Sequence, residues 1–397
     1  MTSLERFREE TREWLRQHGP EPLCGTRQGA FDGFWGGRKA TGVSEDVSRW
    51  LAVNRERGFT APMWPREYGG GGLTRAEAEI LFEEMEARQL PPPLVGFGLV
   101  MIGPTLLDFG NSEQKERHLP AIASGEVRWC QGYSEPGAGS DLASLKTSAT
   151  RDGDSFVING QKVWTSHADQ SDWIFCLVRT SRGERKQEGI TFILIDMATE
   201  GVTVRPIELI SGASPFCEVF LEDVRVPVEN VVGEVDKGWT VAKALLGYER
   251  TIIGKAMGSQ LAAAEGALVE LARRHLDDPA GLGGAPELRS DIARFGMDEA
   301  CFSLTLERIA QARESGQAPG PESSVVKVAG SELKQRRWEL AMRVAGPQAA
   351  GWEGPGFAAE DLQMTRDWLR SRGNSIEGGT SEVQLNIIAK RVLGLPQ

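Results

Sequence analysis

Phe156-Val157-Ile158-Asn159-Gly160-Gln161-Lys162-Val163-Trp164-Thr165-Ser166 is the stretch that carries the clearest fold signal in this chain. Strand-forming residues stand on both sides of an Asn-Gly pair, and Asn-Gly suits the type I′ turn of a β-hairpin. The stretch therefore predicts two paired strands, 156–158 and 162–164. The apolar runs 173–178 and 190–195 are too short for helices and predict buried strands in the same region.

The sequence on either side of this β region has a helical pattern. Thr74-Arg75-Ala76-Glu77 is a capping box that opens an amphipathic run. The helical period returns at Trp239, and Ser381-Glu382-Val383-Gln384 caps a last helix. Helices, strands and helices in this order predict an α+β fold rather than βαβ alternation. The expected domains are an N-terminal helical domain 1–124, a central β domain 125–235 and a C-terminal helical domain 236–397.

Composition excludes several classes of protein. The chain has 397 residues, 25% of them charged, and a net charge of -11, whereas nucleic-acid binders carry a basic footprint. Residues 1–14 are dense in Arg and Glu and have no apolar core of signal-peptide length, and no stretch approaches the apolar length that a bilayer span needs. The five cysteines are scattered without C-x-x-C spacing, so we read them as buried small hydrophobes and predict neither disulfides nor a metal site. A cytoplasmic protein is expected.

Two more stretches carry candidate chemistry: Trp129-Cys130-Gln131-Gly132-Tyr133-Ser134-Glu135-Pro136-Gly137-Ala138-Gly139-Ser140-Asp141 and Gly378-Gly379-Thr380-Ser381-Glu382. Gly137-x-Gly139 lacks the third glycine and the strand–helix setting of a dinucleotide fingerprint, which argues against a Rossmann domain. Trp164 with the two hydroxyl residues after it offers a ring face and donors to a flat heterocycle. Alternatively, Trp164 is a sheet-core aromatic and the glycines only form turns.

In this order and at these distances, the three stretches resemble the flavin-site segments of the acyl-CoA dehydrogenase family, over nearly the whole chain. The resemblance implies that family's fold, with a C-terminal four-helix bundle, and FAD as cofactor. The positions that match its FAD contacts are Gln131, Tyr133, Ser134, Gly139, Ser140, Trp164, Thr165, Ser166, Thr380, Ser381 and Glu382. The positions assigned to the acyl-CoA substrate are Ser140, Ser214, Arg250 and Gly379, with a structural ion pair as the alternative role of Arg250.

The implied reaction removes the α proton of an acyl-CoA thioester while the β hydride passes to flavin N5, which leaves a trans-2-enoyl thioester. It needs a carboxylate as base. Many family members place this Glu directly before the Gly-Thr pair, where this chain has Gly378. A subgroup that includes isovaleryl- and long-chain-like members carries the base on an earlier helix, and Glu249 matches that position. Glu377 is the second candidate, and a solvated helix carboxylate is the alternative reading of Glu249.

The chain departs from the family pattern at two places that normally hold the flavin across a subunit interface. The Arg-x-x-Phe-Gly motif is missing from residues 271–279, where Arg274 is a possible remnant and Asp277-Asp278 would repel a diphosphate. The Gln- and Gly-rich turn near 343–349 is also altered. One hypothesis is an α2β2-like assembly with a related subunit, as in pimeloyl-CoA-type and steroid side-chain-type dehydrogenases. The alternative is a homo-oligomer that uses Arg273 or Arg274.

Three functions are compatible with these residues. The first is a dehydrogenase that passes electrons to an electron-transfer flavoprotein. The second is an acyl-CoA oxidase on the same fold, and the third is a flavin-poor structural subunit of a heteromer, which would need no base. The acyl group cannot be read from the sequence, although Gly96, Gly98 and Gly247 leave room for a bulky one.

Overall fold

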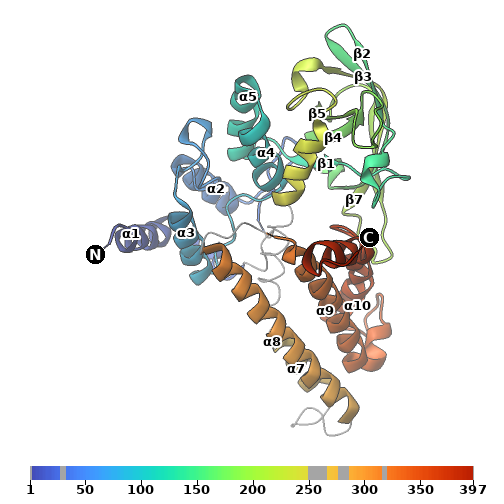
Figure 1. Ribbon diagram of the computed structural model, residues 1–397. Coiled ribbons are helices and arrows are strands. Elements are labelled where there is room, and N and C mark those ends of the chain that lie inside the picture. The colour runs from blue at the N-terminus through green and yellow to red at the C-terminus, as the bar shows by residue number, and fades with distance from the viewer. Residues whose placement is uncertain (1, 27–32, 249–265, 276–285, 315–319, 397) are drawn as a thin grey trace. The chain divides into compact units, whose positions relative to one another are not determined.

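A computed structural model describes residues 2–26, 33–248, 266–275, 286–314 and 320–396 (Figure 1). The chain divides into two compact units. The first comprises Met1–Ile207 and Pro215–Glu249, and the second comprises Glu208–Ser214 and Arg250–Gln397. The segment between two strands of the first unit, residues 208–214, therefore packs with the second.

Short helices form the N-terminal part of the first unit: α1 (Ser3–His18), α2 (Glu45–Arg57), α3 (Arg75–Ala87), α4 (Gly103–Phe109) and α5 (Ser112–Ala123). A π-helical turn, Gly98–Ile102, leads into α4. The predicted capping box at α3 is present, because the Thr74 hydroxyl accepts a hydrogen bond from the Glu77 N–H and the Glu77 carboxylate accepts one from the Thr74 N–H. Leu15, Trp50 and Leu81 are fully or almost fully buried in the core of this layer.

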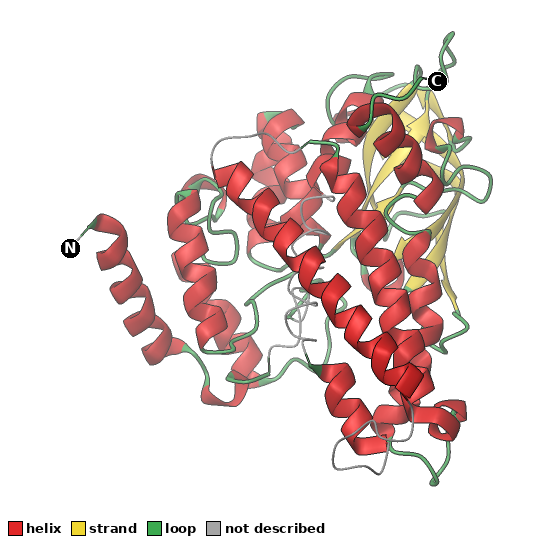
Figure 2. Ribbon diagram, turned by 60° about the horizontal axis from the view of Figure 1, so that its bottom comes forward, coloured by secondary structure: helices red, strands yellow, loops and turns green. Residues whose placement is uncertain are grey.

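The strands of the described chain all lie between residues 129 and 227 and form one sheet (Figure 2). They are β1 (Trp129–Gly132), β2 (Ser148–Asp152), β3 (Ser155–Ser166), β4 (Trp173–Arg179), β5 (Ile190–Asp196), β6 (Val202–Ile207) and β7 (Phe216–Pro227). The order is β1-β4-β2-β3-β7-β6, with β5 also paired to β4. Most pairs are antiparallel, as short connections allow, while β1 runs parallel to β4.

The predicted hairpin at Asn159-Gly160 is wrong, because β3 runs straight through this pair. The hairpin turn lies instead at Gly153-Asp154, between β2 and β3. Gly160 is needed for space instead: a Cβ there would lie 2.7 Å from the Cα of Thr147. The Asn159 amide donates to the Asp223 carboxylate, and the Asp223 N–H donates to the Asn159 side-chain oxygen. Asp223 lies in a bulge of β7.

Strands β4 and β5 are buried on both faces, as their apolar runs predict. Phe175 and Phe192 point into a core shared with α4 and α5, whereas Cys176 and Ile193 point into a second core on the other face. Successive side chains of a strand alternate between the two sides of a sheet, so a continuous apolar run requires a core on each side.

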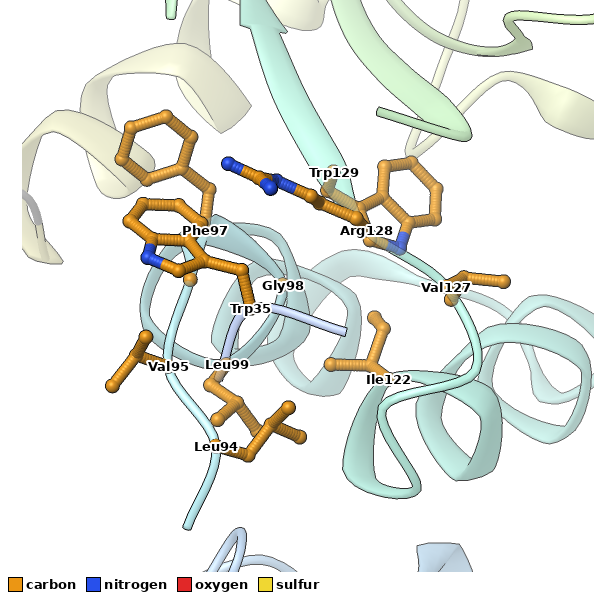
Figure 3. A pocket seen from close by; sticks show the side chains of 11 residues that line it. Trp35, Leu94, Val95, Phe97, Gly98, Leu99, Ile122, Val127, Arg128 and Trp129 are labelled. Carbon is orange, nitrogen blue, oxygen red and sulfur yellow. The ribbon is translucent and has the colours of Figure 1, made fainter. Parts of the chain in front are cut away.

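Two of the glycines that predicted room for a bulky acyl group serve close packing instead. A Cβ on Gly98 would lie 2.9 Å from Ile122, and one on Gly96 would lie 3.0 Å from the Trp35 ring. The cavity beside them, lined by Trp35, Arg128 and residues of the 94–99 segment (Figure 3), has a volume of about 10 Å³. It is large enough for a water molecule and too small for an acyl chain. A Cβ on Gly247, in contrast, meets no described atom within 4 Å.

The second unit is helical. It contains α7 (Ala267–His275), α8 (Pro286–Glu314), α9 (Glu322–Ala345), α10 (Ala359–Ser371) and α11 (Ser381–Ile387), with a π-helical turn Ile388–Val392 at the end of α11. Its core is built from buried Leu271, Phe295, Phe302, Leu333 and Leu340. The N-cap of α11 is Thr380, whose hydroxyl accepts a hydrogen bond from the Val383 N–H, so the helix cap lies one residue before the predicted Ser381.

The cysteines only partly match their predicted role. Cys130, Cys176 and Cys217 are buried, but Cys24 is half-buried and Cys301 is exposed on α8, which corrects the reading of all five as core residues. No described helix has both the length and the apolar character that a transmembrane span requires.

His118 on α5 makes the stability of the first unit depend on pH. It lies edge-on to Trp129 and Trp173, and burial, with a smaller contribution from the charge of Arg117, lowers its pKa from 6.5 to about 4. The folded protein therefore keeps His118 neutral, whereas the unfolded chain binds a proton below pH 6.5. This contribution to stability is complete above pH 6.5 and is lost as the pH falls toward 4.

We predict that this one group removes roughly 3 kcal/mol of stability between pH 7 and pH 4. The measurement is the denaturation midpoint against pH for the wild type and for His118→Phe, which keeps an aromatic ring and cannot titrate. The variant should lose less stability over this range. Parallel curves for His118→Phe and the wild type would contradict the assignment.

Candidate functional site

Trp164 is exposed because a β-bulge redirects it. Lys162 pairs with Val219 and Thr165 pairs with Cys217, so β3 carries one more residue than β7 at this point. Trp164 occupies the left-handed region, with φ +60°, and its side chain is 55% exposed beside the Phe216 ring. A large aromatic residue in this backbone region is costly and is typical of functional positions. The reading of Trp164 as a sheet-core aromatic is therefore wrong.

The bulge also connects the second candidate stretch to the first. Because β3 departs from regular pairing there, the Val163 N–H donates to the Ser134 carbonyl at 2.9 Å. Beyond Ser134, Glu135 and Ala138 exchange two backbone hydrogen bonds and close a tight turn. A Cβ on Gly137 or Gly139 would meet no described atom within 4 Å, so this turn faces open space.

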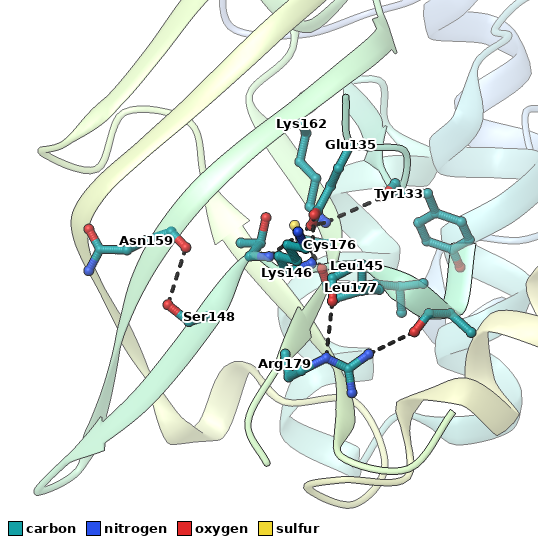
Figure 4. A network of polar contacts seen from close by, with 12 residues as sticks. Tyr133, Glu135, Leu145, Lys146, Ser148, Asn159, Lys162, Cys176, Leu177 and Arg179 are labelled. Carbon is teal, nitrogen blue, oxygen red and sulfur yellow. Dashed lines mark hydrogen bonds and ion pairs between the residues drawn. The ribbon is translucent and has the colours of Figure 1, made fainter. Parts of the chain in front are cut away.

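A buried ion pair fixes the turn to the sheet (Figure 4). The Nζ of Lys162 lies 2.7 Å from Glu135 Oε1, and Lys162 is fully buried. The carboxylate of Glu135 also accepts hydrogen bonds from the Lys146 N–H at 2.6 Å and the Thr147 N–H at 2.9 Å. Burial alone would raise the pKa of Glu135, but the Lys162 charge and these donors outweigh it and hold the pKa below its ordinary value.

Arg179 at the end of β4 holds the loop that follows Ser140. Its guanidinium donates to the carbonyls of Ala143 at 2.8 Å and Leu145 at 3.0 Å (Figure 4). It also donates to the Lys186 and Glu188 carbonyls of the β4–β5 connection. Four carbonyls on one planar cation fix the loop after Ser140 to the β4–β5 connection.

The other flavin candidates of the first unit differ in exposure. Ser140 is exposed, Gln131, Ser134 and Ser166 are half-buried, and Tyr133 and Thr165 are buried. The Thr165 hydroxyl has no hydrogen-bond partner among the described residues, and buried hydroxyls normally have one. An exposed indole, an unsatisfied hydroxyl next to it in sequence and an open glycine turn are features that fit a bound flavin.

The third candidate stretch lies in the second unit. Gly378 and Gly379 both have positive φ, +64° and +90°. A Cβ on Gly379 would lie 2.6 Å from the side-chain nitrogen of Gln384, which donates to the Gly378 carbonyl at 2.9 Å. Only glycine suits two consecutive residues of this kind, so a Glu at position 378 would be strained. Thr380, Ser381 and Glu382 follow as the N-cap and first turn of α11.

Glu377, the second candidate base, has both carboxylate oxygens engaged. Arg370 Nη2 lies 2.6 Å from one oxygen, and the Asn374 amide donates to the other. Both oxygens therefore already accept a hydrogen bond, one of them from a guanidinium.

Lys327 on α9 is a charged residue that the sequence did not single out. It is 8% exposed, and its Nζ has no hydrogen-bond partner among the described residues. Burial lowers its pKa, while the charges of Glu377 and Glu382 act in the opposite direction. A buried cation therefore lies beside the stretch whose residues match the family's FAD contacts.

Glu249 and Arg250 lie outside the described residues. The helix of residues 238–248 precedes them, and it buries Val241, Ala242 and Leu245 in the core shared with the sheet. At its end, the Tyr248 hydroxyl donates to the Asp108 carboxylate of α4, and burial together with that carboxylate raises the pKa of Tyr248 to about 12.

The structure describes part of the two segments in which the chain departs from the family's interface pattern, residues 271–279 and 343–349. Arg273 pairs with Glu270 at 3.3 Å, and Arg274 is exposed at the end of α7. Asp277 and Asp278 lie outside the described residues. In the altered 343–349 segment, Arg343 bonds Asp291 at 2.7 Å and Gln348 is exposed in a short 3-10 turn.

Two of the three predicted stretches are thus brought together, by the Val163–Ser134 bond and the Lys162–Glu135 ion pair. The sequence did not identify Lys162 as the residue that joins them. A signal was present: Phe156, Ile158 and Lys162 share the parity of one strand face, so the lysine stands where the strand pattern places a core residue.

A helical–β–helical chain with these residues has the architecture of a flavin-dependent oxidoreductase. Family models of acyl-CoA dehydrogenases match nearly all of it: the N-terminal domain over residues 35–126, the middle domain over 130–224 and the C-terminal domain over 236–393. The chain belongs to the acyl-CoA dehydrogenase family. Members of this family are FAD-dependent oxidoreductases that act on acyl-CoA, so the cofactor is FAD, and the predicted fold class is confirmed.

The chain is also similar over its whole length to individual members. It is 38% identical to the acyl-CoA dehydrogenase IpdE1 of Mycobacterium tuberculosis, covering 100% of this chain and 99% of that protein. The solved Tcur3481–Tcur3483 steroid ACAD has a TM-score of 0.77 at 30% identity, over 100% of this chain and 98% of that one. The ChsE4–ChsE5 complex from Mycobacterium tuberculosis has a TM-score of 0.75 at 30% identity, with the same coverage.

We predict that Lys162→Met destabilises the protein by about 3–5 kcal/mol, because it leaves the Glu135 carboxylate buried without its cation. Lys162→Met combined with Glu135→Gln should recover part of the loss. The matched control is Lys186→Met, which breaks a pair of the same type, at 2.6 Å from Asp141, with both side chains more than half exposed. That substitution should cost less than about 1 kcal/mol. Chemical denaturation measures all three, and equal effects at positions 162 and 186 would refute the prediction.

A second prediction concerns Trp164. Trp164→Ala should lower the bound FAD per protein severalfold, because the exposed indole face is lost, while the denaturation midpoint of the flavin-free protein changes little. Trp164→Phe retains an aromatic face and should retain most of the flavin. The visible absorbance of the purified protein gives the flavin content. Wild-type FAD content in Trp164→Ala would show that the ring does not contact the cofactor.

Proposed function

We propose that this protein catalyses the α,β-dehydrogenation of an acyl-CoA thioester to the trans-2-enoyl-CoA, with Glu249 as the base that removes the α proton. FAD, held by the candidate residues given below, would supply a two-electron acceptor for the β hydride at N5. The substrate loses one proton to the Glu249 carboxylate and one hydride, so the product carries the new double bond. An electron-transfer flavoprotein is the proposed acceptor that reoxidises the cofactor.

The observation that supports this base is the backbone of Gly378. Many family members have Glu at this position, but here φ is +64° and the following glycine is left-handed as well. A carboxylate cannot be placed there without strain, and the adjacent Glu377 is engaged by Arg370 and Asn374. A chain that keeps the family's chemistry then needs another carboxylate. Glu249 matches the alternative base position, directly after the helix of residues 238–248.

The proposed flavin contacts follow from the family resemblance, and each unit contains candidates. In the first unit, the candidates are Gln131, Tyr133, Ser134, Gly139, Ser140, Trp164, Thr165 and Ser166; in the second, they are Thr380, Ser381 and Glu382. The exposed Trp164 ring and the unsatisfied Thr165 hydroxyl give the strongest physical support. For the substrate, Ser140, Ser214 and Gly379 are proposed to contact the thioester arm, and Arg250 the nucleotide arm of CoA.

We further propose that the protein works in a heteromer with a related subunit, in an α2β2-like arrangement. The family's interface motif is missing from residues 271–279, and Arg273, one replacement for it, is already paired with Glu270. The ChsE4–ChsE5 structure is a complex of two different chains, which supports the same arrangement here. Similarity to a steroid ACAD supports a bulky, ring-bearing acyl group as substrate. Free thiols at all five cysteines are consistent with the cytoplasm as location.

We expect Glu249→Gln to lower kcat by about 100-fold or more, because a base aimed at the reacting proton contributes a factor of this size. The rate of flavin bleaching after mixing with a panel of linear, branched and ring-bearing acyl-CoA thioesters measures this step directly. Glu377→Gln is the matched control, a neighbouring carboxylate with the same change of charge, and should keep near-wild-type kcat. Near-normal turnover of Glu249→Gln would overturn the base assignment.

The same assay separates the competing functions. Enoyl-CoA formed with an artificial acceptor, at equal rates with and without air, indicates a dehydrogenase, whereas peroxide in air indicates an oxidase. A protein with neither flavin nor turnover, alone or with a co-expressed subunit, would be a structural subunit. Full and tightly bound FAD in a purified homo-oligomer would contradict the heteromer.

A further inference from the structure

We infer that Arg366 on α10 is a positioning residue for the acyl-CoA substrate. It fixes the β6–β7 loop, residues 208–214, so that Ser214 is held ready for the thioester arm. This inference rests on the proposed function, in which Ser214 contacts that arm. It adds a residue of α10 that lies outside the three stretches that carry the family resemblance.

The β6–β7 loop has a tight internal structure. The Leu209 N–H donates to the Ala213 carbonyl at 2.9 Å, and the Gly212 N–H donates to the Leu209 carbonyl at 2.8 Å. Ile210 at the tip is 74% exposed, whereas Ser211 beside it is buried. The loop joins two strands of the first unit but packs as part of the second. Its described contacts in the second unit include Arg366 of α10 and Trp352.

Arg366 makes three contacts with the loop and its support. Its guanidinium lies 4.0 Å from the centre of the Trp352 ring, Nη1 donates to the Ser211 carbonyl at 3.2 Å, and Nη2 donates to the Trp352 carbonyl at 3.1 Å. A planar cation can stack on an aromatic ring and donate in two directions at once. Lysine has a single point charge and cannot reproduce this combination.

Gly212 shows how closely the loop is seated on this support. It has φ +78°, and a Cβ there would lie 2.6 Å from Arg366 Nη1 and 3.1 Å from Trp352 Cζ2. The support is itself fixed, because the Thr365 hydroxyl, next to Arg366 on α10, donates to the Ala349 carbonyl at 3.1 Å, three residues before Trp352. Backbone, ring and guanidinium form a clamp, defined here as Arg366, Trp352 and Gly212.

A clamp of this kind acts on binding rather than on the chemical step. Ser214 is exposed and follows Gly212 by two residues, so the direction of its side chain depends on the turn that the clamp holds. A loop that is ordered before the substrate arrives need not be ordered by binding energy. Loss of the clamp should therefore raise KM for acyl-CoA and leave kcat near the wild-type value, since the contacts of Arg366 given above are to the loop and to Trp352.

The test compares Arg366→Ala, Arg366→Lys and Gly212→Ala with a matched control, Arg372→Ala. Arg372 also lies over a tryptophan, 5.2 Å from the Trp368 ring, and pairs with Glu339 at 2.8 Å, without a contact to the β6–β7 loop. The probes are butyryl-, octanoyl- and cholanoyl-CoA, and the kinetics use whichever the wild type oxidises fastest. Hydrogen–deuterium exchange of a peptide that covers residues 208–214 reports the loop itself.

For Arg366→Ala we expect KM to rise about tenfold or more, the size of effect that loss of hydrogen bonds from a charged group produces, with kcat within about twofold. The loop peptide should exchange faster than in the wild type. Arg366→Lys and Gly212→Ala should shift KM in the same direction, and Arg372→Ala should leave both KM and loop exchange unchanged.

The inference is overturned if Arg366→Ala keeps wild-type KM and loop exchange, or if Arg372→Ala raises KM as much. In either case a wild type that oxidises one of the probes leaves the proposed function standing. A wild type that oxidises none of them, with flavin and partner subunit present, refutes the proposed function first, before any variant is compared.

Discussion

The candidate flavin site of the first unit depends on the buried ion pair between Lys162 and Glu135. Glu135 directly follows Ser134, and Lys162 stands two residues before Trp164, so this pair ties the two stretches together at their centres. The carboxylate further holds the backbone of Lys146 and Thr147, where the loop after Ser140 returns to the sheet. Removing either charge leaves the other buried and uncompensated, so the loss of one partner lowers the stability of the fold strongly.

The bulge in β3 allows Lys162 to be buried in the ion pair while Trp164, two residues later, is exposed. In a regular strand, residues 162 and 164 point to the same face, so a buried Lys162 would bury Trp164 as well. The extra residue in β3 breaks this parity: the buried positions are even-numbered before the bulge, and Thr165 is the buried one after it. The strand can therefore anchor Lys162 in the interior and expose an indole two residues later. The left-handed backbone at Trp164 is the local cost of this change, and the ion pair helps to keep it in place.

The sequence predicted those features that depend on local patterns. The α3 capping box, the doubly buried strands β4 and β5 and the helical return after the sheet all follow from spacing within a few residues. The predictions were wrong where a residue distant in the sequence determines the local structure. The pair Asn159-Gly160 by itself predicts a turn, but it lies in the middle of a strand, where Gly160 packs against Thr147 and Asn159 bonds to Asp223. Gly96 and Gly98 leave no room, because Trp35 and Ile122 fill it. The candidate site residues came from family resemblance. Arg179 and Arg366, which make positioning contacts, lie outside every motif, and Lys162 lies within one without having been identified as a positioning residue.

These positioning contacts share one physical property. Each uses a single long cation to bind carbonyl oxygens or a carboxylate on loops that have little secondary structure of their own: Lys162 and Arg179 around residues 133–147, and Arg366 at residues 208–214. Such a loop exposes backbone groups that a sheet or helix would satisfy internally, and a cation with several donors satisfies them together. The glycine pair 378–379 is the counterpart in the second unit: its left-handed backbone gives up the usual place for a base, and the Gln384 amide holds the segment in this shape. In the proposed function, Glu249 serves as the base, and the backbone of this glycine pair supports that proposal as much as the identity of residue 378 does.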